Sequence, residues 1–372
     1  MAMVKLGDVA IEKRETWTGS TQGVPIVGLE HLVPGEITLS SWDSDTDNTF
    51  SKMFRKDQVL LGRRRVYLKK AVIAPFDGIC SGDITVIEAI PEKISSRLLP
   101  FIIQNERFFD YAMQGSAGSL SPRVKWEHLK DYEFNLPDYE EQESLANKLW
   151  SALKLKESYH SLLFATDEMV KSRFIEQFGG NEKTLPLSEW IGTTFPGEWG
   201  TDDIDGTGVK VIRTTNFTNT GKLDLTNVVT RDIETGKVQK KQLKPGDIIL
   251  ERSGGTADNP VGRVVYFEAE GIYLFNNFTQ LLRCKDGVNS LYVFYSLFNY
   301  YQTHKNEIRS MGNKTTGIQN LKMDKYWEIP IVDASSESQE EFVSLYRQAD
   351  KSKFELKQAI EKIDKVMRAL LQ

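Results

Sequence analysis

Hydrogen-bond donors gather in the first half of this chain in a stretch that suits a polyanion. Between Lys52 and Lys70 eight side chains are basic and one, that of Asp57, is acidic, although the whole chain carries a net charge of -5. Lys, Ser and Thr side chains suit phosphate oxygens, whereas Arg and Asn or Gln side chains pair with the edges of guanine and adenine. The stretch therefore favours contact with DNA, and a solvated basic surface is the alternative.

Similar donor-rich loops recur in the second half, so the candidate DNA contacts form two groups. In the first half we expect them at Arg63, Arg64, Arg65, Lys69, Lys70, Ser116, Ser119, Arg123 and Lys125. In the second half we expect them at Arg213, Thr215, Asn216, Arg252, Ser253, Asn313, Lys314, Thr315, Thr316 and Lys322. Each group taken alone is also compatible with an exposed polar loop.

No recognisable catalytic constellation accompanies these donors. Residues 137–141 superficially resemble an acidic nuclease motif, but no paired acid-x-Lys strand follows them. Residues 205–208 lack the lysine of a phosphate loop, and residues 254–262 have the wrong order for an amino-methyltransferase motif. The four histidines and two cysteines are scattered without metal-ligand spacing. We therefore expect neither a catalytic nor a metal site in this chain.

Length and composition indicate a globular protein of more than one domain. The chain has 372 residues, 40% of them hydrophobic, which is enough to fill two or three cores. Its longest apolar runs fall far short of the roughly 20 residues that span a bilayer, and residues 1–15 lack the apolar segment of a secretory signal. The two distant cysteines fit reduced thiols, so we expect a cytoplasmic protein.

The order of predicted elements in the first half is repeated in the second. Strand-like runs, an apolar helix, a polar loop and a Pro-containing segment precede a long helix without Pro or Gly in each half. In the first half these elements are residues 25–32, 58–68, 71–76 and 83–90, the helix 96–113 and the long helix 140–178. Their counterparts are residues 210–217, 243–255, 262–268 and 275–285, the helix 291–304 and the long helix 337–372. Such an ordered set of matches indicates an internal duplication.

The long helices carry heptad-like apolar residues that neither helix buries alone. About 40 residues of helix extend roughly 60 Å, and the simplest way to cover their apolar side chains is an antiparallel pair. We therefore predict an α+β protein with two α/β domains, related by a pseudo-two-fold axis and joined by two long antiparallel coiled-coil helices. The predicted division is residues 1–137, 138–180, 181–335 and 336–372.

On these residues the chain resembles the specificity (S) subunit of type I restriction-modification systems over its whole length. The most specific segment is LPDYEEQESLANKL (136–149), which is similar to the family's Pro-(x)n-Glu-Gln-x-x-(Ile/Leu)-Ala opening of its first conserved helix. The RFIEQFGG (173–180) and GDIILERSGG (246–255) segments are also similar. The second junction, residues 329–342, keeps Gln339 and Glu340 but lacks the usual Pro-rich opening. The start of the second long helix is therefore less sharply predicted than the start of the first.

The resemblance implies a non-catalytic subunit that recognises DNA sequence. Two target-recognition domains would each read one half of a gapped double-stranded DNA site, and the two helices would set the gap. The helices would also dock two modification (methyltransferase) subunits, which restriction (translocase/nuclease) subunits would join. S-adenosylmethionine, ATP and magnesium would then belong to those partners, with no cofactor on this chain and no membrane partner. A pseudo-two-fold places the half-sites on opposite strands, about one helical turn apart.

Two other classes of function remain open from the residues alone. A coiled-coil scaffold, with domains that bind other proteins, would account for the long helices. An enzyme, either a nuclease or a methyltransferase, would need catalytic residues outside the familiar motifs. Metal-dependent cleavage or methyl transfer by the isolated chain would support the enzyme.

Overall fold

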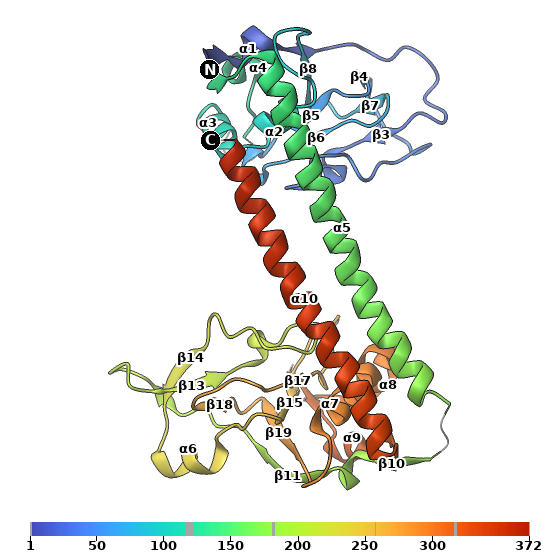
Figure 1. The fold of residues 1–372 in the computed structure, drawn as a ribbon, viewed down its shortest axis with the longest axis vertical. Helices are drawn as coiled ribbons and strands as arrows, with labels where there is room; N and C mark the ends of the chain where they lie inside the picture. Colours follow the sequence, from blue (N-terminus) through green and yellow to red (C-terminus); the bar gives the residue numbers. More distant parts are fainter. Residues whose placement is uncertain (1, 117–121, 181–182, 257, 316–317, 372) are drawn as a thin grey trace. The chain divides into compact units, whose positions relative to one another are not determined.

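The computed structural model describes residues 2–116, 122–180, 183–256, 258–315 and 318–371 (Figure 1). It divides into two compact units, one made of residues 1–162 and 356–372 and the other of residues 163–355. Each unit contains one α/β domain together with a part of each long helix. Among the described residues, no helix is both long and apolar enough to cross a membrane.

The first domain is built on a four-stranded antiparallel sheet with the strand order β2-β8-β5-β6. A smaller sheet pairs β7 in parallel with β3 and antiparallel with β4, and β1 pairs with β9. The elements are β1 (Ala2–Lys5), α1 (Leu6–Val9), β2 (Ala10–Lys13), β3 (Ile26–Val27), η1 (Leu29–His31), β4 (Lys52–Phe54), β5 (Val59–Gly62), η2 (Val66–Leu68), β6 (Ala71–Ile73), β7 (Gly78–Cys80), β8 (Ile84–Ala89), α2 (Leu99–Ile103), α3 (Glu106–Gln114), α4 (Trp126–Leu129) and β9 (Glu133–Leu136).

The second domain has a four-stranded antiparallel sheet with the order β11-β19-β15-β17. Beside it, β13 pairs in parallel with β18, and β10 pairs with β22. The elements are β10 (Thr184–Pro186), η3 (Leu187–Glu189), β11 (Ile191–Pro196), β12 (Thr201–Asp202), β13 (Val209–Ile212), η4 (Thr214–Asn216), β14 (Val229–Asp232), α6 (Thr235–Lys241), β15 (Ile248–Glu251), β16 (Ser253–Gly254), β17 (Val264–Tyr266), β18 (Tyr273–Phe275), β19 (Thr279–Cys284), α7 (Ser290–Thr303), α8 (Lys305–Met311), β20 (Gly312–Thr315), β21 (Ile318–Leu321), α9 (Met323–Trp327) and β22 (Pro330–Val332).

The two domains therefore share a plan of strand pairing. The central strands β5 and β15 are buried along their whole lengths, which explains why both appear as unbroken apolar runs in the sequence. The second domain adds β12, β14 and α6, and it pairs β21 with both β16 and β20. At the corresponding place in the described part of the first domain, Arg64 and Arg123 form an isolated bridge.

The structure divides one predicted helix and shortens one predicted strand, each for a local reason. The predicted helix 96–113 is two helices, α2 and α3, since Asn105 caps α3 by accepting a hydrogen bond from the amide of Arg107 at 2.9 Å. The predicted strand 58–68 ends at Gly62, because the chain then enters a turn in which Arg65 and Lys69 have positive φ.

The long helices, α5 (Tyr139–Phe178) and α10 (Ser336–Leu370), contact each other through ion pairs inside each unit. In the first unit, Lys156 Nζ lies 2.7 Å from Asp364 Oδ1. In the second unit, Lys353 Nζ lies 2.5 Å from Asp167 Oδ1, and Arg173 contacts Glu341 at 2.8 Å. Higher numbers on α5 meet lower numbers on α10, so within the second unit the two helices run antiparallel.

Both long helices carry, as their fourth residue, a glutamine that makes the same hydrogen bond. The side-chain amide of Gln142 donates to the carbonyl of Pro137 at 3.0 Å, and that of Gln339 donates to the carbonyl of Ala334 at 2.9 Å. Both glutamines are buried, with 2% and 8% of their surfaces exposed. The second junction therefore keeps the hydrogen bond of the first although it lacks the Pro-rich opening.

We predict that Gln142→Ala and Gln339→Ala each lower the free energy of unfolding by about 1–3 kcal/mol, because each leaves a carbonyl without its donor. Urea denaturation monitored by circular dichroism measures the change. Glu143→Ala, at a partly exposed neighbour in the same helical turn, is the control and should cost much less. Equal losses in all three variants would contradict this role for the glutamines.

Candidate nucleic-acid interface

An arginine stands just beyond a central strand in both domains, held by the same backbone hydrogen bond. The carbonyl of Arg63, after β5, accepts from the amide of Val124 at 3.0 Å. The carbonyl of Arg252, after β15, accepts from the amide of Leu321 at 2.8 Å. The two arginines therefore occupy equivalent backbone positions, which neither the basic stretch nor the polar loops reveal by their sequences alone.

A lysine follows this hydrogen bond directly in each domain. Lys125 stands at the N-cap of α4 and is exposed, and Lys322 stands at the N-cap of α9 and is half-buried. Each domain thus brings an arginine and a lysine together from segments far apart in the chain. An arginine and a lysine on neighbouring segments suit a base edge and the phosphate beside it.

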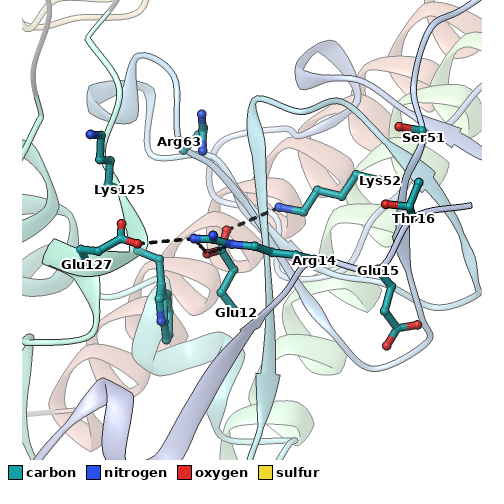
Figure 2. A pocket seen from close by; sticks show the side chains of 10 residues that line it. Glu12, Arg14, Glu15, Thr16, Ser51, Lys52, Arg63, Lys125 and Glu127 are labelled. Carbon is teal, nitrogen blue, oxygen red and sulfur yellow. Dashed lines mark hydrogen bonds and ion pairs between the residues drawn. The ribbon is translucent and has the colours of Figure 1, made fainter.

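In the first domain, the arginine and the lysine line a pocket of about 680 Å³, which we call the Arg14 pocket (Figure 2). Its other lining residues are Glu12, Arg14, Glu15, Thr16, Ser51, Lys52, Trp126 and Glu127. Figure 2 shows Arg14 lying between Glu12 and Glu127, from which it is separated by 2.6 and 3.4 Å. The pocket therefore has cations at its edge and a carboxylate at its base.

The buried base of the Arg14 pocket is an ion pair. The Glu12 side chain is 6% exposed, and one of its oxygens lies 3.6 Å from the ammonium group of Lys52. That ammonium group also donates to the carbonyl of Ile84 at 2.9 Å. Burial lowers the pKa of Lys52, and the Glu12 carboxylate opposes this shift. The Nε atom of Arg63 is buried without a hydrogen-bond partner in the described structure.

The equivalent position in the second domain has neutral partners. Arg252 donates through Nη1 to the side-chain oxygen of Gln280 at 3.3 Å. The amide nitrogen of Gln280 in turn donates to the hydroxyl of Thr194 at 2.7 Å. Because Thr194 on β11 and Glu12 on β2 pair with equivalent residues of β19 and β8, a hydroxyl in one domain replaces a carboxylate in the other. The two domains thus place one arginine in different polar surroundings.

A second cationic group in the first domain surrounds Asp83. Arg123 contacts its carboxylate through two nitrogens, at 2.7 and 3.2 Å, and Arg64 lies 3.6 Å away. The hydrogen bond from Arg123 is the main cause that lowers the pKa of Asp83, and the positive charge of Arg64 adds to it. The same bond raises the pKa of Arg123. This cluster keeps an excess of positive charge beside Arg63.

Two predicted contacts, Asn216 and Ser253, are corrected by the structure, because their side chains serve the fold. Asn216 is 4% exposed, its oxygen accepts from the amide of Arg213, and its nitrogen donates to two backbone carbonyls. Ser253 is 5% exposed and donates to Asn320 at 2.7 Å. A donor that is buried and already bonded is not available to a base edge. Lys70 differs, because its half-buried ammonium group donates to the carbonyl of Leu29 at 2.7 Å and has two further N–H donors, so this contact stays a prediction.

The remaining predicted residues have varied surroundings. Lys69 contacts Glu106 at 2.5 Å, and the Ser116 hydroxyl and the Arg213 Nε are buried without a partner in the described structure. Arg65, Thr215 and Asn313 are exposed. Lys314 and Thr315 lie on β20, whose backbone alone is described there. Ser119 and Thr316 lie outside the described residues.

The residues that line the Arg14 pocket from β2 and from the segment directly after it were not predicted. Glu12 and Arg14 belong to the short run EKRE (12–15), which has no excess of positive charge and so gave no signal. Gln280 was missed because it lies inside an apolar strand run. Only the long-range strand pairing brings these residues to the arginines, and single-sequence patterns do not report such pairing.

The described residues offer little to covalent or metal chemistry. Burial raises the pKa of both thiols, Cys80 and Cys284, to about 12, so neither supplies a thiolate at neutral pH. Among the described residues, no three His, Cys, Asp or Glu side chains are grouped so that they would hold a metal ion.

Comparison with known proteins points to one family. Residues 192–365 match a family model described as the type I restriction modification DNA specificity domain. The EcoDI specificity subunit of Escherichia coli is 25% identical over 135 residues, which is 36% of this chain and 26% of that protein. The chain therefore matches about a quarter of the length of that relative.

Two solved structures share the fold over the whole chain. The type I restriction-modification S subunit of M. genitalium superposes with a TM-score of 0.61 at 12% identity, covering 100% of this chain and 96% of its own. A chain from a type I R-M system, solved in a study of complex assembly and conformational transition, gives 0.60 at 17% identity, with coverage of 100% and 96%.

We predict that Asp83→Asn lowers the free energy of unfolding by about 1 kcal/mol at pH 7, because Arg64 and Arg123 lose their counter-charge while the partial exposure of the pair limits the effect. An aspartate with a lowered folded pKa stabilises the fold above its unfolded pKa of about 3.9 and loses that contribution as the pH falls through the folded pKa. Thermal melts between pH 7 and pH 3 should show the difference from wild type shrinking below about pH 4. A constant difference, or one equal to that of the exposed control Asp110→Asn, would contradict the assignment.

Proposed function

We propose that this chain, whose residues 192–365 match the type I restriction modification DNA specificity domain, reads a gapped two-part DNA site and leaves the chemistry to partner subunits. The observation that carries the proposal is the equivalence of Arg63 and Arg252. Both copies of the duplicated fold keep the arginine, and both keep a lysine directly after the residue whose amide binds the carbonyl of that arginine. This equivalence favours two domains that bind the same kind of ligand. That ligand is double-stranded DNA, because these side chains suit base edges and phosphates.

The two readers would recognise different half-sites. Arg63 lines the Arg14 pocket together with Glu12 and Lys52. Arg252 instead contacts the neutral side chain of Gln280, which in turn contacts Thr194. Glu12 and Gln280 are buried and already bonded, so they would act through the electrostatic surroundings of the arginines and not by contact with a base. Readers that differ in this way support an asymmetric target, and the resemblance to specificity subunits implies the same.

Matched ion pairs support a pseudo-two-fold relation between the long helices. Lys156 and Asp167 lie on α5, and the same number of residues separates each of them from its counterpart on α10, Lys353 and Asp364. Lys156 pairs with Asp364, and Lys353 pairs with Asp167. The same interval separates the two junction glutamines, Gln142 and Gln339. Two helices tied at symmetric positions would act as a spacer of fixed length between the half-sites.

Exposed apolar side chains on the long helices suit the docking of protein partners. In the first unit, α5 exposes Leu155 and Leu162, at 45% and 50%. In the second unit it exposes Phe164, Met169 and Ile175, at 70%, 45% and 46%. We propose that two modification subunits bind these helices and that restriction subunits join the complex. S-adenosylmethionine, ATP and magnesium would belong to those subunits, in a cytoplasmic assembly.

We predict that Arg63→Ala and Arg252→Ala each relax the sequence requirement at one half-site and leave the other intact. Loss of one base contact costs about 1–3 kcal/mol, which is roughly a 5- to 150-fold loss of affinity for the cognate duplex. The measurement is selection from a random-sequence duplex pool by the chain reconstituted with its modification subunits. Arg97→Ala, in a helix-contacting segment of the first unit, is the control. Unchanged selection by both arginine variants would favour a protein-binding scaffold instead.

We predict that removing one heptad from α5 within 145–174, with the matching heptad removed from α10, shortens the gap and keeps both half-sites. One heptad is about 10 Å of helix, which corresponds to about three base pairs. Sequencing of the duplexes selected by the variant measures the gap. A change in either half-site sequence would contradict separate reading domains.

A further inference from the structure

The turn between β5 and β6 holds two cationic residues in a conformation that favours glycine. Arg65 and Lys69 have φ of 53° and 51°, in the left-handed region, and they flank the short helix η2. A residue with a Cβ pays free energy to adopt this conformation, and such outliers gather at functional sites. The turn therefore needs an explanation beyond chain reversal.

The second domain makes the equivalent turn with glycines. The amide of Gly62 donates to the carbonyl of Lys70 at 2.8 Å, and the amide of Glu251 donates to Arg263 at the same distance. Because Arg63 is equivalent to Arg252, the residues two positions later, Arg65 and Gly254, align. Because Lys70 and Arg263 accept equivalent hydrogen bonds, the residues directly before them, Lys69 and Gly262, also align. Both glycines have positive φ, 111° and 106°. Glycine adopts the positive φ at these positions without strain, whereas the first domain has two cationic residues there.

The strained turn presents apolar side chains to solvent. Tyr67 and Leu68 are 52% and 41% exposed, while Val66 beside them is 1% exposed and anchors the turn in the core. The ion pair between Lys69 and Glu106 joins the turn to α3. An exposed aromatic ring and an aliphatic side chain are therefore held at the tip of a well-fixed turn.

The charge around this tip indicates its occupant. Residues 63–70 include five basic side chains and no acid, and the Arg123–Asp83–Arg64 cluster lies against the same turn through the bond from the amide of Arg65 to Pro122. An apolar tip surrounded by cations complements a polyanion with an apolar interior. Duplex DNA has this composition, with phosphates outside and stacked bases inside.

We propose that the turn 65–69 is a wedge that inserts Tyr67 and Leu68 against a base step of the half-site read by the first domain, while Arg65 contacts the adjacent phosphate. The inference rests on the proposed function and adds a second mode of reading to it. Insertion partly unstacks the step, so a flexible pyrimidine–purine step is favoured at that place. The corresponding turn of the second domain has Gly254 and Gly262 at the positions of Arg65 and Lys69.

The direct test uses 2-aminopurine, whose fluorescence rises when it is unstacked. The probe is a duplex selected from a random-sequence pool by the complex of the full chain with its modification subunits, labelled at each first half-site position in turn. The resemblance to specificity subunits implies that the modification subunits methylate an adenine. We expect a rise at one step other than this methylated adenine, its loss in Tyr67→Ala, and its retention in the control Tyr139→Ala, which removes another exposed tyrosine. A rise confined to the methylated adenine, unchanged in Tyr67→Ala, would overturn the wedge.

Arg65→Gly separates a contact role from a structural one. Glycine adopts the left-handed conformation without strain, so the melting temperature should not fall, whereas affinity for the selected duplex should drop about fivefold or more and its salt dependence should weaken. Arg107→Ala, at an exposed arginine of α3, is the control. Unchanged affinity in Arg65→Gly, or affinity and melting temperature falling together, would contradict the proposal. If the wild-type complex selects no duplex at all, the proposed function itself fails.

Discussion

Neither long helix can bury its apolar side chains alone, and this constraint organises the rest of the chain. In the second unit Phe174 and Phe178 of α5 pack with Phe342 of α10, and Tyr292 and Tyr295 of α7 complete the cluster, with ring centroids 4.9–6.4 Å apart. In the first unit Leu149 of α5 is buried in the domain core, and Trp150 packs edge-on against Phe101 at 5.2 Å. Each domain is thereby attached to the helices through apolar contacts. The polar loops remain available for a ligand.

The same constraint explains how two different readers are built from one plan. The apolar contacts and the junction glutamines recur in both halves, and so do the central strands and the hydrogen bonds from Val124 to Arg63 and from Leu321 to Arg252. The residues near the arginines are free to differ, because they lie on the loops and on the strand next to the scaffold rather than inside its core. A carboxylate or a hydroxyl can then stand at one position without loss of the fold.

Much of this architecture was predictable from the sequence, because it depends on local patterns. Apolar runs marked β5 and β15, and the absence of Pro and Gly marked both long helices. The candidate site was less predictable. Asn216 has a residue type that suits adenine, but a three-residue turn uses its amide to hold backbone groups. Glu12 and Gln280 carried no local signal, since they reach the arginines only through strand pairing between distant segments. Local periodicity indicates which helix or strand forms, but it does not indicate which side chains from distant segments come into contact.

The central claim is that this chain alone determines a gapped DNA target. The measurement that tests it most directly is sequencing of methylated adenines across the host genome, with the gene present and with it deleted. The account predicts one gapped, asymmetric motif that is methylated on both strands and disappears on deletion. Persistence of every methylated motif after deletion, or loss of an ungapped motif only, would contradict it.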